Sequence, residues 1–205
     1  LIPRPNGKKY TREQIALLSM IVALKQVSSM EDIRHMPNLA EISLYRQNIS
    51  DISALKESSA IRLGLGFNPL TDLTPLEGRE DIVYLNLAGL DIADTRSIST
   101  LTGLKALNLG GTKITSLAGL EGLEITEINL CNMALADWSE MNRLTNLKEL
   151  YINGLTWDKV YTLSSLELRS LVSTLSDAVP LRDIAALRGL ESVDYRTAEE
   201  QSVTG

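Results

Sequence analysis

The sequence has very few of the residues that build catalytic or metal sites. It contains one cysteine and one histidine, Cys131 and His35, so it can form neither an internal disulfide framework nor a four-thiolate metal site. His35 has no serine or cysteine partner at a spacing that indicates a catalytic triad. Cys131 is expected on an exposed strand without basic neighbours, where its thiol would be inert. We therefore expect no enzymatic activity, no cofactor and no bound metal.

Basic residues are also scarce. The chain has 20 lysines and arginines against 26 aspartates and glutamates, a net charge of −6, and a pI near 4.9. Nucleic-acid binding needs basic patches that displace counterions from phosphates, so nucleic acid is not an expected partner. The apolar run at residues 15–24 is too short to span a bilayer, and no small-residue cleavage site follows it. Membrane insertion is therefore not expected.

What the sequence does contain is a repeat. Residues 101–120 follow an L-x-x-L-x-L pattern with an apolar return leg, which indicates a short strand, a turn and a tight path back to the next strand. Such a unit cannot bury its apolar edge alone and needs a copy on each side. The second apolar strand position recurs every 21 or 22 residues, at Leu44, Leu65, Leu87, Leu109, Leu130, Ile152, Ser173 and Tyr195.

Two further columns keep the same period. One opens the motif, at Leu39, Ala60, Ile82, Leu104, Ile125, Leu147, Leu168 and Leu190. The other lies on the return leg, at Ile52, Leu73, Thr95, Leu117, Trp138, Val160 and Leu181. Together these columns resemble the leucine-rich repeat family, and the pairs Asp51-Ile52 and Asp72-Leu73 resemble bacterial internalin-type repeats. The resemblance implies an α/β repeat fold, a right-handed solenoid with a concave parallel β-sheet.

The columns also predict how the chain is divided. Residues 1–35 form a lead-in and an N-terminal helical cap, because Thr11 and Gln14 fit a capping box and Val22 would share an apolar face with residues earlier in that helix. Residues 36–198 hold seven full repeats and a partial eighth, and residues 199–205 are a polar tail. The return legs are short and carry Pro75 and Pro180. We therefore expect turns or 3₁₀ helices there rather than full α-helices.

Three features of the repeats have a structural interpretation beside a functional one. In the family, an asparagine in the turn hydrogen-bonds buried backbone groups, and about half of the equivalent positions here can do so, among them Asn68 and Thr112. An aspartate column could bind calcium or could accept backbone N–H bonds within each turn, and we favour the second. Trp138 and Trp157 fall in interior columns, which predicts core residues rather than a binding site. The aspartate column comprises Asp51, Asp72, Asp94 and Asp137.

The residues that alternate with the buried leucines predict an open strand face. Tyrosine and arginine are enriched at protein-binding hot spots, and they gather near its N-terminal end with Phe67. Towards the other end two glutamates lie on adjacent strands, where like charges cost stability, and this indicates a partner with a basic patch. The alternative is that all of these are ordinary solvated residues. The candidate binding residues are Tyr45, Arg46, Arg62, Phe67 and Tyr84, an amide ladder of Asn86, Asn108 and Asn129, and the acidic end Glu127, Glu149 and Tyr151.

These features predict a non-catalytic module that binds a protein partner on the concave face. The resemblance to internalins implies a bacterial surface or secreted protein, and we favour that location over the cytoplasm. One alternative is an intracellular scaffold or a regulatory subunit that binds an enzyme, which a single unpaired cysteine would suit. Another is a structural spacer within a larger protein.

Overall fold

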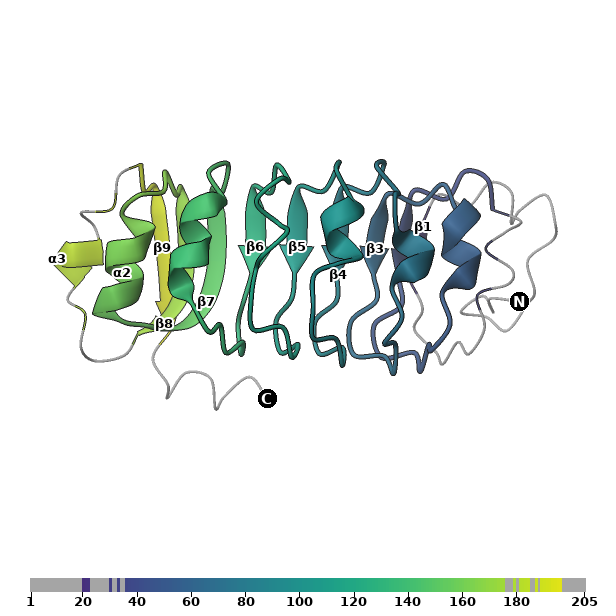
Figure 1. Ribbon diagram of the computed structural model, residues 1–205, viewed down its shortest axis with the longest axis horizontal. Helices are drawn as coiled ribbons and strands as arrows, with labels where there is room; N and C mark the ends of the chain where they lie inside the picture. Colours follow the sequence, from purple (N-terminus) through teal and green to yellow (C-terminus); the bar gives the residue numbers. More distant parts are fainter. Residues whose placement is uncertain are drawn as a thin grey trace.

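The chain forms an elongated solenoid around one parallel sheet. The computed structural model describes residues 20–22, 30, 33, 36–175, 179, 181–184, 187 and 189–196. Nine strands follow one another in the sheet in chain order, from β1 to β9, and every neighbouring pair is parallel. Figure 1 shows the strands side by side along the long axis, with the helical return legs on one side of the sheet.

Eight of the nine strands lie at the positions that the repeat columns predict. Most are only three residues long, because each repeat needs just enough extended chain to bury one apolar side chain between two outward ones. The predicted strands are β2 (Glu41–Ser43), β3 (Arg62–Gly64), β4 (Tyr84–Asn86), β5 (Ala106–Asn108), β6 (Glu127–Asn129), β7 (Glu149–Leu155), β8 (Ser170–Leu175) and β9 (Ser192–Arg196).

The ninth strand, β1 (Met20–Val22), corrects the prediction for the N-terminus. We expected a helix that reached Val22, but Ile21 pairs in register with Ile42, one repeat further along the chain. A short apolar run has no period that separates a helix from a buried strand, and here the neighbouring strand decides. The remainder of the expected capping helix, from Thr11 to residue 19, lies outside the described residues, as does the polar tail at 199–205.

The return legs agree with the prediction in the first repeats and depart from it in the last ones. Four are 3₁₀ helices: η2 (Ser53–Glu57), η3 (Thr74–Leu76), η4 (Ile98–Thr100) and η5 (Trp138–Arg143). Two are short α-helices instead, α2 (Trp157–Leu163) and α3 (Leu181–Ile184). Pro180 precedes α3, and proline is compatible with the first turn of a helix, so it was poor evidence against one.

The apolar columns form a continuous core between the sheet and the return legs. Leu65, Leu87 and Leu109 follow three adjacent strands and are each 0% exposed. Burying one such leucine contributes roughly 1.5–3 kcal/mol. A second ladder runs through the strand centres and is equally buried: Ile42, Leu63, Leu85, Leu107, Ile128, Leu150 and Leu171.

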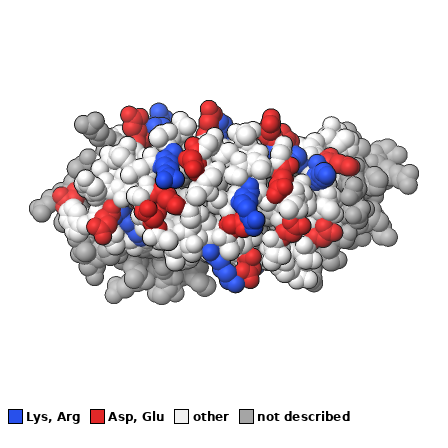
Figure 2. All heavy atoms as spheres, in the orientation of Figure 1, with Lys and Arg blue, Asp and Glu red and all other residues white. Residues whose placement is uncertain are grey.

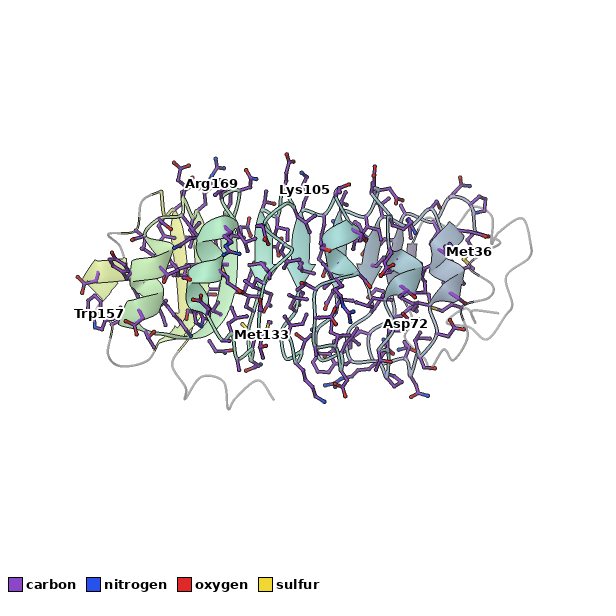
Figure 3. All side chains as sticks on the ribbon, viewed as in Figure 1. Met36, Asp72, Lys105, Met133, Trp157 and Arg169 are labelled. Atoms are coloured by element: carbon purple, nitrogen blue, oxygen red, sulfur yellow. The ribbon has the colours of Figure 1, made fainter. Side chains whose placement is uncertain are left out.

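The two tryptophans differ from the prediction and from each other. Trp138 is half-buried and packs against the core, with Lys159 Nζ 4.4 Å above its ring. Trp157 is 49% exposed, so the prediction that it is a core residue is wrong. It begins the α-helix whose buried stripe consists of Val160 and Leu163, and the helical period places Trp157 at the margin of that stripe. Figure 3 shows Trp157 near one end of the solenoid and Met36 near the other.

Candidate functional site

The candidate residues lie on the face of the sheet opposite the return legs, hereafter the strand face. Strand pairing aligns its outward residues in two rows, because each strand is in register with the next. The first row is Glu41, Arg62, Tyr84, Ala106, Glu127 and Glu149, and the second is Ser43, Gly64, Asn86, Asn108, Asn129 and Tyr151.

An aromatic cluster of Tyr45, Arg46 and Phe67 lies beside the N-terminal end of these rows. The two ring centroids are 4.9 Å apart and tilted by 54°. The Arg46 guanidinium carbon lies 5.2 Å from the Tyr45 ring centre and 5.1 Å from that of Phe67. Tyr45 is 43% exposed and Phe67 is 42% exposed. The cluster therefore presents a large aromatic area that the protein itself does not cover.

The backbone of this cluster is strained. Arg46 and Phe67 have φ values of 55° and 57°, in the left-handed region that costs a side chain with a Cβ roughly 1–2 kcal/mol. The equivalent turn position in other repeats is held by Gly89 or Gly111, or by Asn132, which tolerate this conformation. Strain of this kind concentrates at functional sites. The sequence signal was available, since large residues stand in a column that otherwise favours glycine and asparagine.

Next to the cluster, Arg62 and Tyr84 form one wall of a shallow hollow. The Arg62 guanidinium carbon lies 4.5 Å from the Tyr84 ring centre, and its Nε is 3.7 Å from a carboxylate oxygen of Glu41. The hollow has a volume of about 170 Å³. Its lining joins both rows of the strand face to the aromatic cluster: Glu41, Ile42, Ser43, Tyr45, Arg62, Gly64, Tyr84 and Asn86.

The predicted amide ladder is used differently from our expectation. The Oδ1 atoms of Asn86, Asn108 and Asn129 accept backbone N–H bonds within their own repeats, from the residues two positions later, at 2.9–3.0 Å. The prediction that these amides are free to bond one another or a ligand is therefore wrong for their oxygens. The same bonds fix the orientation of each side chain. The Nδ2 groups make no hydrogen bond to a described residue, so they can donate to a binding partner.

The acidic end of the face lies on β6 and β7. Glu127 and Glu149 are register partners, and Tyr151 follows two residues after Glu149. Burial raises the pKa of the Glu127 carboxyl, Glu149 raises it further, and Arg62 opposes both effects. Burial and the two glutamates also raise the pKa of Tyr151. The described residues supply no salt-bridge partner to either glutamate, so their charges face solvent together.

The turn asparagine does what the family pattern implies at Asn68. Its Oδ1 accepts the N–H groups of Gln47 and Ile49 at 2.9 and 3.0 Å, and its Nδ2 donates to the carbonyls of Leu44 and Leu65, both at 2.7 Å. At the same position two repeats later, the buried Thr112 Oγ1 has no hydrogen-bond partner. The turns are therefore satisfied unevenly along the solenoid.

The aspartate column caps its own turns. Asp51, Asp72 and Asp137 each accept the backbone N–H of the residue two positions later at 2.8–2.9 Å, and Asp94 does so at 3.1 Å. The backbone N–H bond from Thr74 lowers the pKa of Asp72, and the side chain of Ser139, followed by its backbone N–H, lowers the pKa of Asp137. No group of three potential metal ligands occurs in the described part of the chain. The four backbone hydrogen bonds match the turn-capping interpretation.

Among the described residues, the return-leg face carries charges of both signs side by side. Figure 2 shows acidic and basic side chains interspersed over it. Many form pairs between repeats, such as Lys113 with Asp91 at 2.7 Å and Lys105 with Glu124 at 2.5 Å. Figure 3 places Lys105 and Arg169 along one edge of the solenoid. No described helix is long and apolar enough to cross a membrane.

Comparison with known proteins agrees with this architecture. The family described as "Domain of unknown function (DUF1836)" matches residues 1–57, and no curated protein matches the chain. An internalin (inlF) from Listeria monocytogenes matches with a TM-score of 0.71 at 22% identity, over 93% of this chain and 58% of that one. Internalin C2 from the same organism gives 0.67 at 22% identity, over 93% and 86%. A plant peptide hormone receptor, RGFR1, solved in complex with RGF2, gives 0.53 at 19% identity, over 83% and 30%.

The in-register sheet and these likenesses define the class of protein: the chain has the leucine-rich repeat fold. Its repeats, with a period of 21 or 22 residues, share their fold with the two similar internalins. The chain spans little more than half of the first of the similar internalins.

Proposed function

We propose that this chain is a non-catalytic module that binds a protein partner on the strand face. The observation that carries the proposal is the aromatic cluster, in which Tyr45 and Phe67 remain more than two-fifths exposed while Arg46 and Phe67 occupy strained backbone. Large exposed side chains at these positions do not stabilise the fold, because glycine would adopt the same backbone with less strain. A partner that covers the rings would account for them, because tyrosine and arginine dominate the energetics of many protein interfaces.

The rest of the strand face suits the same use. The middle of the strand face has small residues, among them Gly64, Ala106 and Gly110, so that a partner's backbone can approach the sheet. The oriented Nδ2 groups of the asparagines offer donors along the same part of the face. At the far end, Glu127 and Glu149 gain a counter-charge if the partner places a basic group there.

The module acts at the bacterial cell surface or as part of a secreted protein in this proposal. The support for this location is the likeness to two Listeria internalins. The support for a bound partner is the likeness to a plant peptide hormone receptor solved in complex with RGF2. An intracellular scaffold would use the same face, and a structural spacer would use none of it. The binding experiment separates the spacer from the other two.

The test is affinity capture with four substitutions on the strand face. Wild-type chain and a variant with alanine at Tyr45, Arg62, Tyr84 and Glu149 are immobilised and exposed to culture supernatant and cell lysate. A matched control carries alanine at four exposed residues of the return-leg side, Lys56, Arg96, Lys113 and Glu121. Circular dichroism melts confirm that all three proteins are folded.

We expect a specific protein that the wild-type and control chains retain and the strand-face variant loses. Identical captured proteins for all three chains would refute the use of the strand face and favour the spacer. Capture from culture supernatant, rather than from lysate alone, is expected for a surface or secreted module.

A further inference from the structure

Arg62 lacks the close ion pair that Arg79 and Arg96 each form with a carboxylate. Arg96 and Arg79 each hold a carboxylate with two nitrogen atoms at 2.7–3.0 Å, the first with Asp94 and the second with Asp81. Arg62 reaches Glu41 only through Nε, at 3.7 Å, and donates no hydrogen bond to any described residue. Its terminal nitrogens therefore keep their donors for another group.

The surroundings of Arg62 hold those donors in place. The Arg62 guanidinium carbon lies 4.5 Å from the Tyr84 ring centre, and such a contact restricts the orientation of a guanidinium whose N–H groups can bind a planar anion. Arg62 and Tyr84 line the hollow of about 170 Å³ together with Ser43 and Asn86. Because Asn86 Oδ1 is occupied by Ala88 N–H, its Nδ2 is the part that can reach a ligand. Apart from Glu41, the side-chain groups available in this lining are donors or hydroxyls.

We infer that this hollow binds an aspartate or glutamate side chain of a partner segment, with Arg62 as its counter-ion and an adjacent apolar residue packed on the aromatic cluster. The inference rests on the proposed function, since it names what the strand face recognises. Tyr45 belongs both to the hollow and to the cluster, so an acidic residue and its apolar neighbour can be held by one continuous surface.

A single carboxylate fits the local charge better than a polyanion does. Glu41 lies in the lining and the whole chain carries a net charge of −6, so a phosphate with two negative charges would meet repulsion. A carboxylate needs one bidentate partner, which the free edge of Arg62 supplies. The aromatic rings beside it favour an anion attached to a larger, partly apolar segment over a small free ion.

The experiment selects peptides from a random display library on the immobilised wild-type chain. Selected peptides are synthesised with amidated C-termini, and their affinities are measured by fluorescence polarisation. Each is compared with a version in which its acidic residue is replaced by the corresponding amide. The protein variants are Arg62→Gln, which keeps a polar side chain without the charge, and Glu41→Gln, which removes the competing carboxylate. Arg96→Gln on the return-leg side is the control.

We expect the selected sequences to share an acidic residue next to an apolar one. Arg62→Gln should weaken binding by about tenfold or more, the loss of a charge-assisted hydrogen bond, and should make the acidic peptide and its amide version equal. Glu41→Gln should strengthen binding several-fold, a change that a merely structural role of Arg62 would not produce. Arg96→Gln should leave affinity unchanged.

Three outcomes would overturn the inference: selected peptides without a shared acidic residue, equal affinity for wild type and Arg62→Gln, or binding that depends on a free C-terminal carboxylate instead of a side chain. If peptides bind but respond to Tyr84→Ala and Glu149→Ala rather than to Arg62→Gln, the strand face is still the binding surface and only the assignment of the hollow fails. If none of these substitutions changes binding, the proposed function fails as well.

Discussion

The ring of Phe67 lies directly over Gly89. A Cβ on Gly89 would stand 2.7 Å from two carbons of that ring, closer than any van der Waals contact allows. Both residues hold the left-handed turn position of successive repeats, at φ values of 57° and 67°. The large side chain of one repeat is thus accommodated because the next repeat has none.

The first prediction concerns this pairing. Gly89→Ala should cost roughly 2–3 kcal/mol, since it adds the left-handed penalty of about 1 kcal/mol to a clash with Phe67. Gly111→Ala is the matched control, because its φ is 71° and a Cβ there would meet nothing nearer than 3.9 Å. It should cost only about 1 kcal/mol. In a Phe67→Asn background the two alanine substitutions should become equivalent. Guanidinium unfolding measures all of these, and additive effects of Gly89→Ala and Phe67→Asn would contradict the contact.

The second prediction compares two residues at the same turn position. Asn68→Ala should lower the free energy of unfolding by about 4 kcal/mol, because two buried N–H groups and two carbonyls lose their partner together. Thr112→Val should leave stability unchanged or raise it by up to about 1 kcal/mol, since the Oγ1 that it removes is buried without a hydrogen bond. Equal losses for the two variants in urea unfolding would show that this position serves the fold by shape rather than by hydrogen bonding.

The period of the repeat was enough to predict most of the fold. One residue in each strand must be buried between two exposed ones, and a shift by a single residue would turn Leu63 outwards and Arg62 inwards. That constraint, repeated every 21 or 22 residues, determined the register of eight strands and both rows of the strand face. The repeat period did not predict β1, because its short apolar run fits a helix equally well when the neighbouring strand is not known.

The details of the candidate site needed coordinates for a physical reason. The sequence identifies which residues face outwards, but side-chain torsions decide what they contact, and several choices lie within about 1 kcal/mol of one another. Arg62 could have formed a close ion pair with Glu41, and the structure instead stacks it on Tyr84. The asparagines could have bonded across strands, yet each amide oxygen accepts a hydrogen bond from the turn that follows in its own repeat. Phe67 at a glycine-like position was visible in the sequence, and its consequence was missed.

The third prediction concerns the pH dependence of stability at the acidic end. Burial and Glu149 raise the pKa of Glu127, so its charged form is disfavoured in the folded chain, and stability falls as pH rises above about 4.5 through the raised pKa. Glu127→Gln should therefore raise stability at neutral pH, by less than about 1 kcal/mol for a group that is largely solvated, and the gain should vanish at acidic pH.

Glu124 is the matched control for Glu127. Lys105 lowers the pKa of the Glu124 carboxyl, so its contribution is present above the ordinary carboxyl pKa and is lost as pH falls through the lowered value. Glu124→Gln should therefore weaken the fold slightly at neutral pH. Thermal melts of both variants across the acidic range test the signs. A Glu127→Gln variant that is less stable than wild type at neutral pH would mean that the glutamate pair is neutralised within the chain.

The fourth prediction joins the two ends of the strand face. Arg62 on β3 and Glu127 on β6 are three strand spacings apart, about 14 Å. An extended segment covers that distance in about four residues. In peptides whose acidic residue occupies the hollow, a lysine about four positions away, on one side only, should therefore increase affinity roughly fivefold.

A series of synthetic peptides in which that lysine is moved one position at a time measures the effect, with the wild-type chain and a Glu127→Gln, Glu149→Gln double variant. The optimum should disappear in the double variant, and the lysine's contribution should weaken with added salt. An affinity that is indifferent to the lysine position would mean that the partner crosses the strand face in another direction or in another conformation.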